Sequence, residues 1–511
     1  MGRSRTAIIA KNSIYSLFCY FGTLLLQFVV RTLFIKCLSI EYVGIQGLFT
    51  NILTVLSFAE LGIGNAVSFS LYKPLAENNQ YKVAQLIKFY KTVYRLISLT
   101  VFVLGVGITP FLYSLIREKP DIPENLYIIY LLFVLNTAVS YLFVHKQTLL
   151  LADQKKYIVS LYTIIITTIV CIIQCICLLV FHSIYAYLIV MLIGVVATNV
   201  VLSIKCNREY PSILSKDISS LEKKEKLTIF DNVKSLFYYR IGNVILNGSG
   251  NILISKLFGI TILGLCSNFY YAINAIIGVF SQVLVSFVAT IGNLNAVEDE
   301  EKKMMAFYKT SVFCFWLYGF ICTGFFMFLN DFITLWIGEQ YTLNWFVVFS
   351  IVLVFYVDNV CFPLSSFRVT MGLFRKARFS PIIASVSNIA LAILLSRVWG
   401  VAGVFLAVSV SRFLFVNLVD IYLIFKYGFK RKSFKYFVYY IVFTLFCILA
   451  FFLIKYVIML IDLSNMYVLF ISRLLVFTIG FNLLFVVLFY KLPDFKGLQE
   501  NFLILVNRKN S

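Results

Sequence analysis

Long apolar runs, separated by short polar segments, follow one another from end to end of the chain. A helix needs about 20 apolar residues to cross a bilayer, and by that rule about fourteen of these runs predict membrane-spanning helices. The pattern therefore predicts an all-α integral membrane protein. The predicted spans lie near residues 12–35, 43–71, 84–113, 125–150, 157–180, 185–204, 236–258, 261–293, 306–329, 342–367, 379–397, 401–425, 435–459 and 467–490.

Positive charge alternates from one loop to the next. The richer set of segments lies at residues 3–11, 73–91, 146–156, 205–234, 302–309, 375–378, 426–435 and 491–509. The loops on the other side carry only Lys36, Arg117, Lys119, Lys256, Arg397 and Lys455. Because Lys and Arg collect in short cytoplasmic loops, both termini are expected in the cytoplasm, which agrees with an even number of spans.

The longest polar segment, 206–235, divides the predicted helices into two groups. We expect an N-terminal lobe of six spans over residues 1–205 and a C-terminal lobe of six spans over 236–425. The segment between them is the predicted cytoplasmic linker. Two further helices follow over 435–490, and residues 491–511 form a predicted cytoplasmic tail.

A faint internal repeat supports the two lobes. When Gly264 is set on Gly44, Lys256 falls on Lys36 and Ile260 falls on Ile40. Leu263 and Phe269 then fall on Val43 and Phe49. Internal repeats of this kind are common in secondary transporters.

Composition agrees with a membrane protein and excludes several other classes. Of 511 residues, 61% are hydrophobic and only 13% are charged, with a mean hydropathy of +0.92. The net charge of +21 lies mostly in the loops, so it indicates topology rather than nucleic-acid binding. The 11 Cys form no CxxC pair and only 2 His occur, so neither a disulfide framework nor a metal site is expected.

The stretch from Glu41 to Glu77 places a carboxylate inside an apolar span. Burying Glu60 in lipid would cost about 2.5–3.5 kcal/mol, so its side chain should face protein or water. The neighbouring run Leu61-Gly62-Ile63-Gly64 is a candidate bend, because broken helices often line transport cavities. Alternatively, the glycines only let helices pack closely.

Polar residues form helical stripes in three spans. They are Ser16, Tyr20, Thr23, Gln27 and Arg31 in the first span, Ser57, Glu60, Gly64 and Ser68 in the second, and Arg240, Asn243, Asn247 and Asn251 in the seventh. Such stripes face either a water-filled cavity or another helix. Equivalent stripes on the first helix of each lobe favour a shared cavity.

Charged residues in later predicted spans are further candidates for the shared cavity. Arg412 in the twelfth span joins the stripes as a candidate ligand for a substrate. The candidate cavity residues are Gln27, Arg31, Arg240, Asn243, Asn247, Asn251 and Arg412. Glu60 and Asp358 are candidates for coupling to an H⁺ or Na⁺ gradient, because a desolvated carboxylate can titrate. The alternative is local ion pairing of Arg31 with Glu60, and of Arg412 with Asp358 or Asp420.

The third span begins with an amphipathic segment in which Lys88, Lys91 and Arg95 share one face. One interpretation is a helix end at the lipid headgroup boundary. The other is a basic cytoplasmic vestibule that gathers an anionic substrate. We find no P-loop and no catalytic constellation, so an enzyme is not expected and no cofactor is predicted.

Motifs in the first quarter of the chain resemble those of a known family. They are the run Glu41-Tyr42-Val43-Gly44 with Gly47-Leu48-Phe49, the run Glu60 to Ala66, and the run Leu71 to Ala76. These segments, with the predicted plan of two lobes plus two helices, resemble Wzx-type polysaccharide flippases. That family belongs to the multidrug/oligosaccharidyl-lipid/polysaccharide transporter superfamily, together with multidrug extruders and the lipid II flippase.

The resemblance implies a function in the bacterial cytoplasmic membrane. The protein would move undecaprenyl-pyrophosphate-linked oligosaccharide repeat units to the outer leaflet by alternating access, for capsule, O-antigen or exopolysaccharide synthesis. Membrane lipids, a polysaccharide polymerase and chain-length machinery are the implied partners. The alternative is a cation-coupled exporter of drugs or small metabolites. An acidic and aromatic cavity would favour the exporter, and a cationic cavity would favour the flippase.

Overall fold

A computed structural model describes residues 5–60, 63–214, 219–297 and 299–495. Within these residues all regular structure is helical and no strand occurs, which confirms the all-α prediction. The predicted bend at residues 61–62, the side chains of Ser16 and Ser68, and the tail beyond residue 495 lie outside the described part of the chain.

The chain divides into two compact units after Gln282. The first unit contains α1 (Arg5–Cys37), α2 (Ile40–Leu56), α3 (Ile63–Ala76), α4 (Gln80–Ile108), α5 (Leu126–Tyr141), α6 (Val144–Ala152), α7 (Lys156–Ile176), α8 (Ile184–Glu209), α9 (Pro211–Leu214), α10 (Lys223–Phe258) and the first part of α11 (Ile260–Val297). The second contains α12 (Glu300–Trp336), α13 (Trp345–Val360), α14 (Phe362–Thr370), α15 (Ser380–Trp399), α16 (Val401–Arg412), α17 (Leu418–Leu423), α18 (Phe434–Met459) and α19 (Met466–Phe489).

The predicted lobe boundary lies earlier in the chain than this division. The helix α10 belongs to the first unit because it packs against α2 and α3, although it follows the predicted linker at 206–235. The described parts of the linker pack on the same unit, where Tyr210, Ile213 and Leu221 join a buried apolar cluster. The two six-span lobes, over residues 1–205 and 236–425, stay a prediction.

Eleven helices of the described chain are long and apolar enough to cross a membrane, or up to twelve if the bent pair α5 and α6 is one span. Each predicted span falls on a helix or on a pair of consecutive helices. However, α2 is shorter than the usual span, and α10 is not among the eleven. The protein is a multi-pass membrane protein, whereas fourteen crossings with both termini inside stay a prediction.

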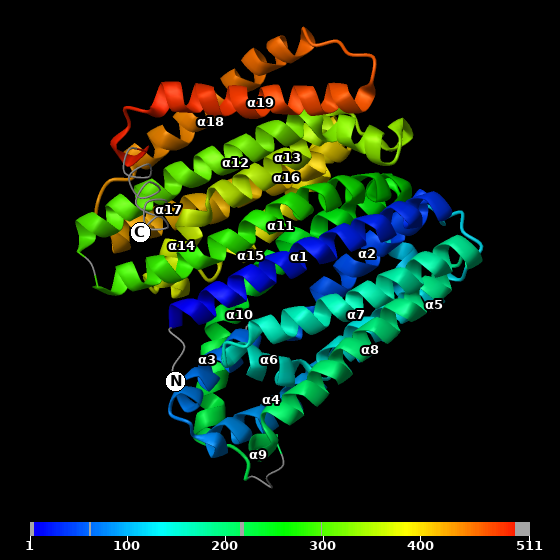
Figure 1. Ribbon diagram of the computed structural model, residues 1–511, viewed down its shortest axis with the longest axis vertical. Coiled ribbons are helices and arrows are strands. Elements are labelled where there is room, and N and C mark those ends of the chain that lie inside the picture. The colour runs from blue at the N-terminus through cyan, green and yellow to red at the C-terminus, as the bar shows by residue number, and fades with distance from the viewer. Residues whose placement is uncertain (1–4, 61–62, 215–218, 298, 496–511) are drawn as a thin grey trace. The chain divides into compact units, whose positions relative to one another are not determined.

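Two spans of the first unit are interrupted. The second predicted span consists of α2, a 3₁₀ turn at Ser57–Glu60, and α3. The fourth consists of α5 and α6, which are bent by 44° at their junction. The helices α3 and α6 pack on each other and on α4, while α7 packs on α1 and α8 (Figure 1). The Glu60 region is therefore a break within a span, as its sequence predicted.

Two glycines let α2 and α11 approach closely. A Cβ atom added at Gly44 would lie 2.1 Å from the carbonyl oxygen of Ile260. A Cβ atom added at Gly264 would lie 2.5 Å from the carbonyl oxygen of Ile40. The two contacts are reciprocal, and they join the same residues that the sequence repeat aligns. Reciprocal contacts of this kind are the mark of a two-fold relation between the two helices.

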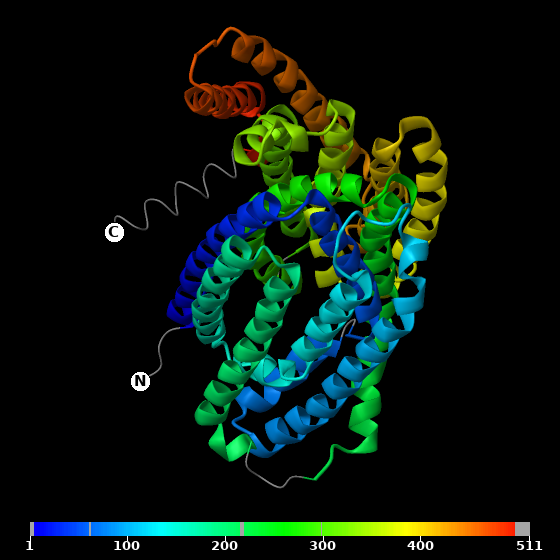
Figure 2. The same cartoon turned by 90° about the vertical axis from the view of Figure 1, so that its right-hand side faces the viewer.

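The second unit is built around α12, which packs against α13, α18 and α19. Aromatic rings pack between α12 and the two C-terminal helices, α18 and α19, which also contact each other. Figure 2 draws these two helices in orange and red. The ring centroids of Phe315 and Phe443 are 5.1 Å apart, as are those of Phe320 and Phe477. The two additional helices of the sequence prediction are thus held to α12 by stacked phenylalanines.

Candidate functional site

A cavity of about 660 Å³, lined by both apolar and polar side chains, lies in the first unit between α1, α2, α7, α8, α10 and α11. Amide, hydroxyl and phenol groups make up most of its polar lining, together with one guanidinium. These residues are Gln27, Arg31, Gln46, Thr50, Asn51, Thr167, Gln174, Tyr187, Thr198, Asn199, Asn251, Ser267, Tyr270, Tyr271 and Asn274. No Asp or Glu occurs among the described residues that line it.

Arg31 on α1 is the only charged residue in that described lining. Its Nη1 donates to Oε1 of Gln46 on α2, and its Nη2 donates to Oδ1 of Asn268 on α11, both at 2.9 Å. The guanidinium carbon lies 5.5 Å from the ring centroid of Tyr271. Its Nε makes no hydrogen bond to any described residue. The charge is therefore solvated by neutral groups, and no described carboxylate neutralises it.

Aromatic rings and amides form the remainder of the wall. The rings of Phe34 and Tyr187 pack edge to face with centroids 5.0 Å apart. Gln174 and Asn199 are buried, and Asn199 donates to the carbonyl oxygen of Val139 at 3.3 Å. Amides and phenols bind hydroxyl-rich ligands by hydrogen bonds, and ring faces pack on the apolar faces of such ligands.

The cavity brings together some of the predicted site residues and not others. Gln27, Arg31 and Asn251 line it. Arg240, Asn243 and Asn247 lie on the same helix as Asn251 but are not among its described lining residues, and the Asn243 amide donates to the carbonyl of Tyr239 within the helix. Periodicity placed these four residues on one stripe, but helix packing decides which part of a stripe meets a cavity. Their role as one substrate site stays a prediction.

Arg412 belongs to the second unit and is paired. Its Nη1 forms an ion pair with Oδ1 of Asp358 on α13. The Arg412 side chain is 7% exposed, whereas that of Asp358 is 50% exposed. Of the two carboxylates considered as partners for Arg412, the structure selects Asp358.

Asp420 pairs instead with Arg368 on α14, with Nε and Oδ1 3.2 Å apart. Both side chains are 3% exposed. The sequence interpretation overlooked Arg368 because it lies one residue beyond the predicted tenth span. The signal that could have found it is an unpartnered Asp420 in an apolar run, which requires a cation nearby.

Glu60 is not a partner of Arg31. It lies at the end of the 3₁₀ turn, where the Tyr141 hydroxyl interacts with the side chains of Glu60 and Ser57. A Cβ atom added at Gly64 would lie 3.2 Å from the Tyr94 hydroxyl and 3.8 Å from Oε1 of Glu60. The carboxylate thus faces tyrosines of α4 and α5, in agreement with the expectation that it faces protein rather than lipid.

The basic residues of α4 are exposed, as the amphipathic pattern predicts. Lys88, Lys91 and Arg95 are exposed, whereas Tyr90 and Tyr94 of the same helix are fully buried. Their role as a vestibule stays a prediction. In the described chain no group of three or more His, Cys, Asp or Glu side chains is placed to hold a metal ion.

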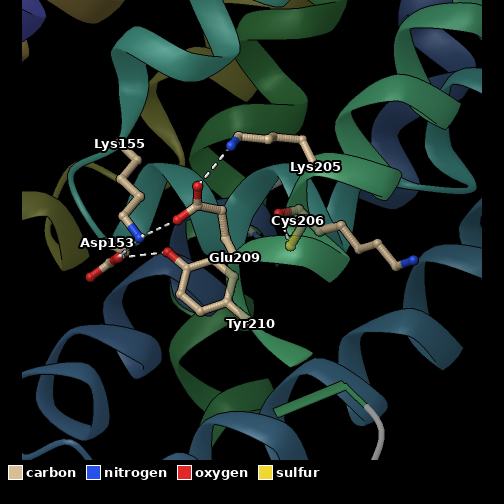
Figure 3. A network of polar contacts seen from close by, with 7 residues as sticks. Asp153, Lys155, Lys205, Cys206, Glu209 and Tyr210 are labelled. Atoms are coloured by element: carbon tan, nitrogen blue, oxygen red, sulfur yellow. Dashed lines mark hydrogen bonds and ion pairs between the residues drawn. The ribbon is translucent and has the colours of Figure 1, made fainter. Parts of the chain in front are cut away.

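A polar network ties the α6–α7 connection to the end of α8 (Figure 3). Lys155 Nζ lies 3.2 Å from Oε2 of Glu209, and Lys205 Nζ lies 2.8 Å from Oε1 of the same residue. The Tyr210 hydroxyl donates to Asp153 at 2.6 Å. Burial, and then the hydrogen bond to Asp153, raise the pKa of Tyr210, so this phenol stays protonated. The network joins the α6–α7 connection to the end of α8 and thereby stabilises the fold of the first unit.

Comparison with known proteins defines the fold. No protein-family model and no curated protein sequence matches this chain. Solved structures do match, and they include MATE family transporters and the lipid II flippase MurJ. The described chain therefore shares the fold of these membrane transporters.

Two of these structures have a TM-score of 0.64. One is an inward-facing multidrug resistance MATE family transporter, 11% identical, which covers 81% of this chain and 97% of its own. The other is the lipid II flippase MurJ in an inward closed conformation, 15% identical, which covers 94% of this chain and 99% of its own. An outward-facing MATE transporter matches with a TM-score of 0.57 and 12% identity, covering 82% and 94%.

Proposed function

We propose that this protein is a flippase that moves a lipid-linked oligosaccharide across the cytoplasmic membrane of a bacterium. The substrate would be an undecaprenyl-pyrophosphate-linked repeat unit for capsule, O-antigen or exopolysaccharide synthesis. A polysaccharide polymerase and chain-length machinery would act on the product. The motifs of the second span and the fold shared with a lipid II flippase support this proposal.

The observation that carries the proposal is the chemistry of the cavity. Arg31 offers a positive charge without an opposing carboxylate among the described lining residues. An anion is the natural partner of such a guanidinium, because charge-assisted hydrogen bonds to phosphate or carboxylate are strong. The surrounding amides and phenols match the hydroxyl groups of a glycan.

Coupling to an ion gradient is part of the same proposal. Glu60 is our candidate for H⁺ or Na⁺ exchange, because it lies at a helix break among tyrosine hydroxyls. Asp358 is the weaker candidate, since Arg412 already neutralises it. The basic stripe of Lys88, Lys91 and Arg95 would gather the anionic substrate before it enters.

A second candidate function is a cation-coupled exporter of drugs or small metabolites. The observation in its favour is the MATE structure, which matches with the same TM-score as the lipid II flippase. The cavity argues against it. Its described lining offers aromatic rings to a cation but no acidic group, and its one charge is the guanidinium of Arg31, which would repel a cationic drug.

The test is a deletion strain complemented with the wild-type gene or with Arg31→Gln. A flippase predicts that lipid-linked oligosaccharide accumulates in the inner leaflet of the deletion strain and that only the wild type relieves this. The exporter predicts unchanged lipid-linked glycan and an increased sensitivity to toxic cations. Unchanged glycan distribution in the deletion strain would disprove the flippase.

A further inference from the structure

The crossing of α2 and α11 forms part of the cavity wall. Val43 and Gly47 of α2 and Ser267 of α11 line the cavity. Gly44 and Gly264 lie beside them, toward the start of both helices, where each backbone touches a carbonyl of the other helix. The few basic residues near this end, Lys36 and Lys256, belong to the set predicted to lie outside.

The glycines make this contact close without bulky side chains. With a hydrogen atom in place of Cβ, each helix approaches the carbonyl oxygen of its repeat-related partner, Ile260 or Ile40. Opening the crossing would also separate the side chains of Ile40 and Ile260, each of which lies against the glycine of the other helix. The two-fold relation means that both repeats contribute equally to the closure.

Arg31 holds the same two helices together beside the crossing. Its guanidinium donates to Gln46, which precedes Gly47 on α2, and to Asn268, which follows Ser267 on α11. Asn268 is completely buried. Because both acceptors are neutral amide oxygens, an anion that enters the cavity can compete with them for the N–H groups.

We propose that the Gly44–Gly264 crossing is the outer gate of the cavity and that Arg31 is its latch. An anionic substrate group withdraws the guanidinium from Gln46 and Asn268, which releases α2 from α11 and lets the crossing open. The gate depends only on the closed contact, whereas the latch rests on the proposed function, because it needs an anionic ligand in this cavity.

A reversible cross-link tests the gate. A Cβ atom added at Gly47 would lie 3.8 Å from Cβ of Ser267, within the roughly 3.5–4.5 Å typical of disulfides. The full-length variant Gly47→Cys/Ser267→Cys should form this bond on oxidation. Each preparation is its own reference: oxidation should lower transport relative to the same protein after reduction.

The matched control is Gly105→Cys/Val134→Cys, which joins α4 and α5 away from the cavity. Its added Cβ would lie 3.4 Å from that of Val134. This variant should transport equally well when oxidised and reduced. Undiminished transport by the oxidised Gly47→Cys/Ser267→Cys protein would overturn the gate. Failure of those cysteines to cross-link would overturn it as well, because the closed contact would then be absent.

A readout without substrate separates the gate from the proposed function. Cys171 lines the cavity, and it can be retained as the only other thiol in a background lacking the remaining native cysteines. A membrane-impermeant maleimide applied outside should label Cys171 in the reduced protein and not in the cross-linked protein. Equal labelling of both forms would contradict the gate, whatever the substrate is.

Inorganic pyrophosphate tests the latch. If it draws Arg31 away from the two amides, it should slow the cross-linking of Gly47→Cys/Ser267→Cys by about threefold or more, because the open state is then more populated. The same addition should have no effect in an Arg31→Gln background. Equal cross-linking rates with and without pyrophosphate in the Arg31 protein would overturn the latch while leaving the gate intact.

Discussion

The two units treat buried arginines in opposite ways. In the first unit, Arg31 is held by two amide oxygens beside the cavity. In the second unit, Arg368 and Arg412 are each paired with an aspartate. A guanidinium that is already neutralised stabilises the fold and has little to gain from an anionic ligand. A guanidinium held by neutral groups can still bind an anion. The position of an arginine within an apolar run therefore does not tell whether it is structural or binds a ligand.

The largest effect is expected at the pair of Arg368 and Asp420. Both side chains are almost completely buried, so Arg368→Leu leaves an unpaired carboxylate and should lower the free energy of unfolding by about 3–5 kcal/mol. The double variant Arg368→Leu/Asp420→Leu should recover most of this loss. Thermal unfolding of the protein in detergent measures both. If the double variant is as unstable as the single one, the unpaired carboxylate is not the cause of the lost stability.

A smaller effect is expected at Asp358 and Arg412, because half of the Asp358 side chain is exposed. Asp358→Asn should lower the free energy of unfolding by about 1–3 kcal/mol by leaving Arg412 without its acid. Adding Arg412→Gln should restore both stability and transport. If the double variant is stable but does not transport, Arg412 or Asp358 takes part in transport, and the contrast between the two units fails.

Arg31→Gln should affect stability less and transport more. Glutamine keeps a donor for one of the two amide oxygens, so we expect a loss of only about 1 kcal/mol in the free energy of unfolding. Transport of lipid-linked glycan should fall by about tenfold or more, because the charge-assisted contact is lost. Arg31→Lys is the control that keeps charge and removes the fork geometry. Normal transport by a stable Arg31→Gln protein would place Arg31 among the structural arginines.

The smallest effect is expected in the partly buried network of Figure 3. Glu209→Gln removes one acidic partner of Lys155, which keeps Asp153, and the acidic partner of Lys205; partly solvated ion pairs contribute about 1 kcal/mol or less. The loss should shrink further at high salt, since screening weakens such pairs. Unfolding measured at low and high ionic strength checks this. A loss comparable with that of Arg368→Leu would show that burial is a poor guide to ion-pair strength in this protein.

The amino-acid sequence by itself determined the helical membrane architecture. Apolar runs of sufficient length and polar loops leave few alternatives in a bilayer, because every backbone polar group must be paired within a helix. The break at Glu60 also followed from local sequence, since a carboxylate and glycines interrupt an apolar run. The aligned pair Gly44 and Gly264 was visible as a repeat, although not as a contact.

Only the tertiary structure decided which polar residues meet. Gln46, Asn268 and Gln174 have no special spacing in the sequence, yet Arg31 binds the first two, and the third lines the same cavity. Arg240 shares a stripe with Asn251, but only Asn251 is among the described residues of the lining. The physical reason is that periodicity gives the face of each helix, whereas the partner of that face depends on how helices distant in the chain cross. For α2 and α11, Gly44 and Gly264 permit that crossing, because a Cβ atom at either position would overlap a carbonyl oxygen of the other helix.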